Sequence, residues 1–526
     1  MKQHDLLSSS EPRVEAVCDV CIIGAGAAGL YLATRLAAKG QSVVILEAGG
    51  RVCSDAASLG VEPVFTGDVY PGATLGRAFG LGGSTSRWGG LLVPHSRHDV
   101  RSCEFEEFDP WRLIVSKVEN RTNAVLSNLG FCHQSDFEHL PKDKLGGLFE
   151  ILRAQGLDTI AAQFLPFNSR NLVFLLKGRS TGTQNIQIFL NAVSNTWRLD
   201  TAISGHSMVN TVGAISANGN TVMVKAKHVV VAAGAIESAR ILLEIKRSAV
   251  EPVISETAEV GCNLSDHLSC RIADFKPTDY RHVASLFGPR FIRGYMRSFR
   301  FVENKPPSDA PRCFTHFIFD INNPAFHLVK EALSALQAHR LPNVSVAQFV
   351  AGGAGLFSLA FSRYVRSVLF IPEGTAVHLQ LDIEQVPMSI NAVSLTDEID
   401  RYGRPVARIN WRINNVDYAN IQQTAARILS TWPGPRGGLP DLVPVFIRGS
   451  SPKPHDAYHP VGTCRLGIDT GAVVDTHLRV QGTDNLWVLS TGVLPSAGTA
   501  NPTFTMLCLG DELADRLTLE LNRHVS

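Results

Sequence analysis

Two polar side chains near the end of the chain have types and surroundings that could do chemistry. His459 lies in the segment YHPVGTCR, and Asn501 lies in the segment GTANPT. A histidine titrates near neutrality and can accept a hydroxyl proton, while an amide beside it can hold the same oxygen and stabilise a developing alkoxide. Each residue also has an ordinary explanation, as a buried histidine with satisfied hydrogen bonds and as a helix cap. Taken alone, the two residues leave both interpretations open.

The segment around Asn501 carries a strong helix-start signal. Asn501 would occupy the N-cap and Pro502 the first helical position, where the missing N–H costs no hydrogen bond. Leucines at every fourth position then predict a helix over 502–517 with an apolar stripe that packs into the core. The positive end of this helix would point at whatever binds there, such as the anionic ring of a reduced flavin.

A glycine-rich turn near the start of the chain predicts a dinucleotide site. Gly24, Gly26 and Gly29 match G-x-G-x-x-G between a predicted strand over 20–23 and a predicted helix over 27–39. Gly24 allows the tight bend, Gly26 lets the backbone approach a pyrophosphate, and Gly29 allows the helix to pack closely on the strand. The next predicted strand, 42–46, ends at Glu47, whose carboxylate can accept hydrogen bonds from a ribose diol. The motif serves NAD and FAD alike, so it does not choose between them.

Two further strand–helix units spread nucleotide-binding elements over the whole chain. One covers 227–246, and the other joins a strand over 485–492 to the helix over 502–517. This pattern predicts an α/β fold with a Rossmann-like domain assembled from three separate segments, 12–100, 187–270 and 451–526. The segments between them, 101–186 and 271–450, are expected to form a substrate-binding or cap domain.

The longer insertion mixes strand and helix patterns. It contains predicted strands over 377–383 and 406–412, predicted helices over 326–339 and 416–432, and a charged turn over 397–405. An apolar stretch over 349–361 is interpreted as a buried helix or a substrate-domain segment, with a membrane-touching surface as the alternative. It is shorter than the roughly eighteen residues needed to span a bilayer.

Composition excludes several classes of partner. The chain has 526 residues, 45% of them hydrophobic and 18% charged, and a net charge of +1, so no overall field favours nucleic acid or an anionic membrane. Ten scattered cysteines and a start without a signal-peptide pattern favour a cytoplasmic location. No metal site is expected, because no cysteine or carboxylate completes a ligand pattern around His95, His98, His455 or His459.

The chain resembles the glucose–methanol–choline (GMC) family of FAD oxidoreductases in five motifs that occur in the family's order. These are the glycine fingerprint with Glu47, GLGGSTSRWGG at 80–90, AAGAIESAR at 232–240, VGCNLSDH at 260–267, and the C-terminal block from HPVGTCRLG to ANPTFTM. The region 271–377 contributes little to the resemblance.

The resemblance implies a bound FAD, a Rossmann-like domain and a substrate domain built on a mainly antiparallel sheet. It also implies that His459 and Asn501 are the catalytic pair above the flavin: His459 accepts the hydroxyl proton, Asn501 fixes the oxygen, and hydride passes to flavin N5. The residues expected to bind the cofactor are Gly24, Gly26, Ala27, Ala28, Gly29, Glu47, Ala48, Gly82, Gly83, Ser84, Trp88, Gly89, Val193, Ala233, Gly234, Gly492, Asn501, Pro502 and Thr503.

Within the family, the ANPT ending and the STSRW loop are most similar to the pyranose oxidase and sugar dehydrogenase branch. Members of that branch with covalent flavin carry a histidine where Arg87 stands, so the FAD is expected to be non-covalent. The expected substrate is a small alcohol with a secondary ring hydroxyl, a sugar or a glycoside. The alternatives are an apolar sterol or aromatic alcohol, and a lyase with structural FAD. The sequence carries no signal for the electron acceptor, oxygen or another, or for an oligomer.

Overall fold

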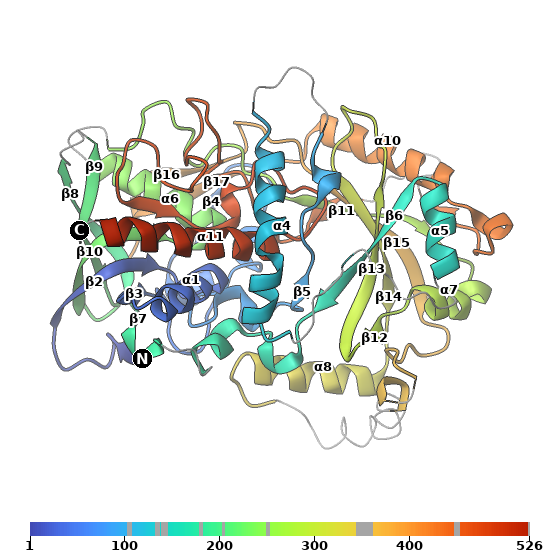
Figure 1. Cartoon of the computed structure of the whole chain (residues 1–526), viewed down its shortest axis with the longest axis horizontal. Helices are drawn as coiled ribbons and strands as arrows, with labels where there is room; N and C mark the ends of the chain where they lie inside the picture. The colour runs from blue at the N-terminus through green and yellow to red at the C-terminus, as the bar shows by residue number, and fades with distance from the viewer. Residues whose placement is uncertain are drawn as a thin grey trace.

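The computed structural model describes residues 1–101, 108–131, 137, 146–177, 182–201, 206–248, 253–342, 361–364, 366–445 and 453–523. Two large sheets lie toward opposite ends of the molecule, and helix α4 (Pro110–Asn128) stands between them (Figure 1).

The first sheet has eight strands in the order β1-β7-β3-β2-β10-β9-β8, with β20 paired to β10. Pairings from β1 to β10, and between β10 and β20, are parallel, whereas β9 and β8 add an antiparallel meander. The strands are β1 (Lys2–Asp5), β2 (Arg13–Ile23), β3 (Val43–Leu46), β7 (Ile186–Leu190), β8 (Val193–Thr201), β9 (Ser207–Ile215), β10 (Thr221–Val231) and β20 (Leu486–Val488).

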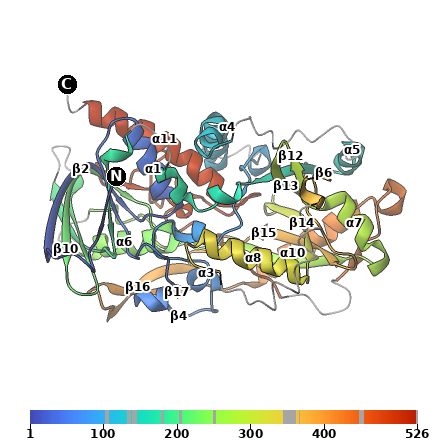
Figure 2. The same ribbon diagram turned by 90° about the horizontal axis from the view of Figure 1, so that it is seen from below.

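Helices cover both faces of this sheet. Figure 2 shows α1 (Ala27–Ala38) and α11 (Pro502–Arg523) together on one side, with α6 (Gly234–Ser248) on the other. Because both faces are covered, the central strands are continuous apolar runs such as Val229–Val231, all fully buried. This arrangement confirms the predicted α/β class and the Rossmann-like domain.

The second sheet has nine strands, and all of its pairings are antiparallel, as the resemblance implied. Its order is β18-β11-β15-β14-β13-β6-β5, with β12 on β13 and β19 on β11. The strands are β5 (Leu91–Leu92), β6 (Leu157–Phe164), β11 (His267–Asp274), β12 (Arg290–Ile292), β13 (Tyr295–Glu303), β14 (Cys313–Asp320), β15 (Ala376–Glu384), β18 (Val443–Pro444) and β19 (His455–Asp456).

Smaller elements complete the fold. The charged turn predicted over 397–405 closes a hairpin between β16 (Ala392–Ile399) and β17 (Pro405–Asn410), and β4 (Val64–Phe65) joins β17. Further helices bounded within the described residues are α2 (Ala56–Leu59), α3 (Pro71–Thr74), α5 (Gly146–Ala154), α7 (Tyr280–Phe287), α8 (Pro324–Gln337) and α10 (Asn415–Thr431).

Two predicted helices end slightly early, each for a local reason. Helix α8 ends at Gln337 because His339 has a φ of +56°, outside the helical region. Helix α10 ends at Thr431 because Trp432 precedes a proline, which disfavours helical backbone at that position. The apolar stretch over 349–361 lies almost wholly outside the described residues. Every helix in the described part of the chain is too short or too polar to cross a membrane.

We propose that the chain divides into a nucleotide-binding domain and a substrate domain, and that a few short strands belong to a different domain from the one the sequence predicts. Residues 2–5 belong with the first part, because β1 pairs with β7. Strand β5 lies in the predicted nucleotide-binding segment 12–100 but pairs with β6 of the antiparallel sheet. Strand β19 lies in the predicted segment 451–526 but pairs with β11 of the same sheet. Short pieces of the nucleotide-binding segments thus extend into the other sheet.

Candidate active site

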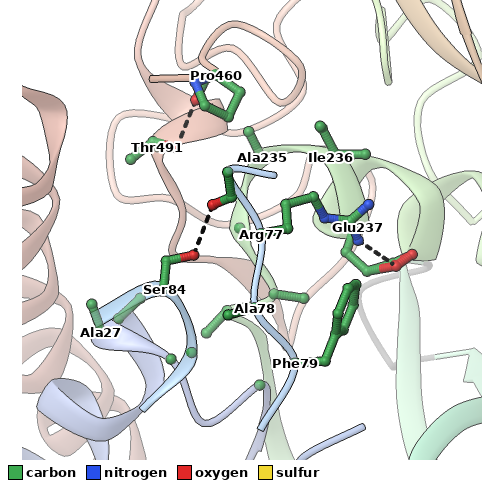
Figure 3. A pocket seen from close by; sticks show the side chains of 18 of the residues that line it. Ala27, Arg77, Ala78, Phe79, Ser84, Ala235, Ile236, Glu237, Pro460 and Thr491 are labelled. Atoms are coloured by element: carbon green, nitrogen blue, oxygen red, sulfur yellow. Dashed lines mark hydrogen bonds and ion pairs between the residues drawn. The ribbon is translucent and has the colours of Figure 1, made fainter. Parts of the chain in front are cut away.

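A cavity of about 560 Å³ opens where several parallel strands of the first sheet end. Gly24, Glu47 and Ala232 line it, and each is the first residue after a strand, β2, β3 and β10 respectively. In open α/β sheets, ligands bind at this carboxyl edge of the strands. Figure 3 shows the part of the wall formed by Arg77, Ser84 and neighbouring residues.

The glycine turn has the geometry that a dinucleotide needs. Gly24 has a φ of +105°, and a side chain there would meet the carbonyl oxygen of Ala232 at 2.6 Å. A Cβ on Gly29 would lie 1.9 Å from the carbonyl oxygen of Gly24, so this glycine brings helix α1 close to the turn. A Cβ on Gly26 would meet nothing within 4 Å. Gly26 therefore leaves its backbone open toward the cavity, at the helix N-terminus where phosphates bind.

Glu47 is buried at the edge of this cavity and is held by backbone amides. Its two carboxylate oxygens accept hydrogen bonds from the N–H groups of Ala25, at 2.7 Å, and Gly49, at 2.9 Å. Burial raises its pKa to about 7, even though these amide donors act to lower it. A carboxylate oxygen can accept a second hydrogen bond, so Glu47 keeps the capacity to bind a diol.

Most of the residues expected to bind the cofactor line the same cavity. They are Gly24, Gly26, Ala27, Ala28, Glu47, Ala48, Gly83, Ser84, Trp88, Gly89, Ala233, Gly234, Asn501, Pro502 and Thr503. Four are not among the lining residues: Gly29, Gly82, Val193 and Gly492. Gly82 and Gly492 are positions where a Cβ would collide with Asn171 or Thr463, at 2.4 and 2.5 Å. Residues on both sides of Val193 line the cavity instead.

His459 and Asn501 meet at this cavity although 42 positions separate them. The Nδ2 of Asn501 lies 2.8 Å from the Nε2 of His459. His459 follows strand β19 of the antiparallel sheet, and Asn501 directly precedes helix α11, which covers the first sheet (Figure 2). A single hydroxyl oxygen placed in the cavity could contact both groups.

Asn501 does not act as the helix cap that its position predicts. Its Oδ1, the atom that would accept a backbone N–H, is buried and has no hydrogen-bond partner among the described residues. The side chain turns instead toward His459. A buried amide oxygen without a partner is costly, so this atom fits a site that receives a donor from a bound group.

The imidazole of His459 is neutral at neutral pH. Burial lowers its pKa to about 3, and the nearby His267, Arg300 and His95 act in the same direction, whereas Asp382 opposes them. This differs from the near-neutral pKa expected from the residue type alone, because the ring is largely removed from solvent that would stabilise its charged form. The neutral ring presents a lone pair for a proton.

A buried group of charges on the cavity wall has no counterpart in the sequence predictions. Arg77 pairs with Glu237 at 3.2 Å, as Figure 3 shows. Arg240 pairs with Glu237, Glu244 and Asp400 at 3.2, 3.1 and 2.7 Å. Burial acts to raise the pKa of Glu237, but the surrounding guanidinium groups outweigh it and bring the pKa to about 2. The AAGAIESAR motif signals two of these residues, whereas Arg77 lies far away in the sequence.

Comparison with known proteins agrees with this geometry. Residues 387–510 match a family described as GMC oxidoreductase, and residues 22–75 match an NAD(P)-binding Rossmann-like domain. The chain is 24% identical to 6'''-hydroxyparomomycin C oxidase of Streptomyces lividus, over 94% of this chain and 90% of the relative. It is 25% identical to an oxygen-dependent choline dehydrogenase of Serratia proteamaculans (strain 568), over 95% of each chain.

The fold also matches a solved structure, pyridoxine 4-oxidase from Mesorbium loti, with a TM-score of 0.55 and 15% identity. The match covers 95% of this chain and 99% of that one. The C-terminal family match contains His459 and Asn501, and the N-terminal match contains the glycine turn and Glu47. The described structure brings both regions to one cavity, so the similarity to the GMC oxidoreductase family includes the part of the chain that forms the candidate active site.

Proposed function

We propose that the chain is an FAD-dependent enzyme that oxidises an alcohol CH–OH group to a carbonyl, with His459 as the base and Asn501 as the oxygen-binding residue. The observation that carries the proposal is the distance of 2.8 Å between Asn501 Nδ2 and His459 Nε2, in the cavity that also holds the glycine turn. The glycine turn that would bind the nucleotide and the histidine that would accept the proton therefore line the same cavity.

The roles of the two side chains follow from their atoms. The substrate hydroxyl donates its proton to the lone pair of His459 Nε2, and Asn501 Nδ2 donates to the same oxygen as negative charge develops on it. Both side chains are partly buried at the cavity, and a lower local dielectric strengthens both interactions. Bound FAD supplies the hydride acceptor, at N5.

We propose non-covalent FAD as the cofactor, contacted by the expected residues that line the cavity, with the other four shaping the turns and walls around it. The choice of FAD over NAD rests on the family, since the glycine turn serves both. Arg87 lines the cavity where covalent members carry a histidine, and a guanidinium is no nucleophile for a flavin methyl group.

Purified protein should therefore be yellow, and acid precipitation should release its colour. Non-covalent flavin leaves when the fold that holds it is lost, so the supernatant should contain the visible absorbance and the pellet should be white. Chromatography of the supernatant should identify FAD. Yellow colour that stays with the pellet would contradict non-covalent attachment.

The proposed substrate is a sugar or glycoside, oxidised at a secondary ring hydroxyl. The resemblance to the pyranose oxidase and sugar dehydrogenase branch supports a sugar or glycoside, as does the similarity to 6'''-hydroxyparomomycin C oxidase. The choice of a secondary ring hydroxyl rests on the branch resemblance alone. The similarity to choline dehydrogenase is equally extensive, so overall identity does not choose the substrate. The rival is an apolar alcohol, for which the stretch over 349–361 is the sequence feature.

Anaerobic mixing with candidate alcohols tests the proposed function. A sugar or glycoside should bleach the visible absorbance of the oxidised flavin, because hydride transfer reduces the ring. Sterols and aromatic alcohols serve as the comparison set. A lyase would convert its substrate and leave the flavin oxidised. Bleaching by apolar alcohols alone would reject the sugar assignment and keep the reaction class.

A further inference from the structure

The motif VGCNLSDH ends in two residues, Asp266 and His267, that the proposed reaction has not used. Both are fully buried, and both contact His459. We propose that His267 is a positioning residue that fixes the proton of His459 on Nδ1 and thereby keeps Nε2 free to act as the base. The inference rests on the proposed function, because it gives His459 Nε2 the role of base.

Asp266 holds the backbone of the segment that carries His459. Its carboxylate accepts hydrogen bonds from the N–H of His459, at 2.9 Å, and from the N–H of Ala457, at 3.3 Å. The hydroxyl of Tyr70 donates to the same carboxylate. With the backbone held in this way, the orientation of the imidazole depends on its own ring contacts.

Those ring contacts form a chain of hydrogen bonds with one consistent direction. The Nε2 of His267 lies 2.9 Å from the carbonyl oxygen of Gly498, and its Nδ1 lies 3.1 Å from the Nδ1 of His459. A carbonyl only accepts, so the Nε2 of His267 carries the proton. In a neutral ring the other nitrogen then accepts, and the Nδ1 of His459 must donate to it.

The remaining nitrogen of His459 is therefore a lone pair. Nε2 accepts from Asn501 Nδ2 at 2.8 Å, which agrees with the same assignment. A bound substrate hydroxyl would replace this donor at Nε2, and Nδ2 would then donate to the substrate oxygen. The reverse tautomer would place two acceptors against each other at Nδ1 and two donors against each other at Nε2. Because His267 is fully buried, solvent could not relieve the conflict at Nδ1.

The surroundings keep His267 neutral, as this chain of hydrogen bonds requires. Burial lowers its pKa, and His95 and Arg300 act in the same direction, while Asp382 and the Gly498 carbonyl oppose them. The ring of Phe314 packs edge-on against His267, with centroids 5.3 Å apart. His267 also links the two catalytic segments, because Gly498 belongs to the loop that ends at Asn501.

Two variants of equal size separate this role from a structural one. His267→Asn retains an acceptor, its Oδ1, close to where Nδ1 stood, whereas His267→Leu has the same shape without an acceptor. Both lose the donor to Gly498, so this loss cancels in the comparison. FAD content and the flavin spectrum of each holoenzyme serve as the control for folding.

We expect His267→Leu to slow anaerobic flavin reduction by about tenfold or more, because the unproductive tautomer of a catalytic base becomes populated. His267→Asn should reduce its flavin at least about fivefold faster than His267→Leu does. The substrate concentration that gives a half-maximal rate should be similar in the two variants. Nitrogen-15 NMR of histidine-labelled protein, with the His459 signals identified by their absence in His459→Ala, should show Nδ1–H in the wild type and a mixture in His267→Leu.

Equal rates for the Leu and Asn variants, or a wild-type His459 that carries its proton on Nε2, would overturn the inference. The proposed function fails differently. If His459→Ala reduces flavin at the normal rate, His459 is not the base, whereas the NMR signals would still report whether His267 sets the tautomer. The rate of His459→Ala therefore tests the base role of His459, and the NMR signals separately test whether His267 sets the tautomer.

Discussion

Replacing His459 by alanine should slow anaerobic flavin reduction at least about a hundredfold, the lower end of what general-base catalysis contributes. The substitution removes the lone pair that receives the hydroxyl proton. Alanine also opens space for water beside Asn501, and a mobile water is a poor substitute for a fixed base. Stopped-flow absorbance with the alcohol identified by the bleaching screen measures the effect.

The matched control is His455→Ala, a histidine four residues earlier on strand β19. His455 is exposed, and its ring Nδ1 lies 2.9 Å from the carbonyl oxygen of Asp456, away from the cavity lining. Its substitution should leave the rate within about twofold, as for a surface change without a partner in the site. A His459→Ala enzyme as fast as His455→Ala would remove His459 from the mechanism, provided that both variants retain FAD.

Replacing Arg240 by methionine should lower the free energy of unfolding by about 3–5 kcal/mol. The Arg240 side chain is 1% exposed and pairs with Glu237, Glu244 and Asp400. It also donates two hydrogen bonds to the carbonyl oxygen of Pro405, at 3.0 and 2.7 Å. Methionine fills a similar volume but leaves these carboxylates buried beside fewer positive charges. Breaking a buried pair on one side is costly for this reason.

An arginine-to-methionine substitution at an exposed position of the same helix, α6, provides the comparison for Arg240→Met. Arg247 of α6 pairs with Asp397 at 3.0 Å, but the two side chains are 51% and 99% exposed. Arg247→Met should cost less than about 1 kcal/mol, because solvent screens an exposed pair. Urea unfolding at one fixed FAD concentration measures both variants, since bound cofactor itself contributes to stability. Equal losses for the two variants would show that burial of the Arg240 cluster contributes nothing.

The local elements could be predicted because their causes are local. The strand–turn–helix with Gly24, Gly26 and Gly29 follows from buried apolar runs and the spacing of the glycines. Helix α11 begins at Pro502 as predicted, since proline is accepted at a first helical position. The family resemblance added what no local pattern contains, the pairing of His459 with Asn501.

Contacts between distant segments required the tertiary structure. Asn501 has the sequence of a helix cap, yet its side chain turns to His459, a choice made by a neighbour 42 positions away. Arg77 meets Glu237 across 160 positions, and no period or motif connects them.

By itself, the sequence determined the α/β class, the dinucleotide turn and the residue types of the site, because backbone preference and hydrophobic period act over a few residues. Only the tertiary structure decided which hydrogen bond each buried group makes, including the one between His267 and His459. The physical reason is burial: once water is excluded, a polar atom must take the partner that folding brings within reach.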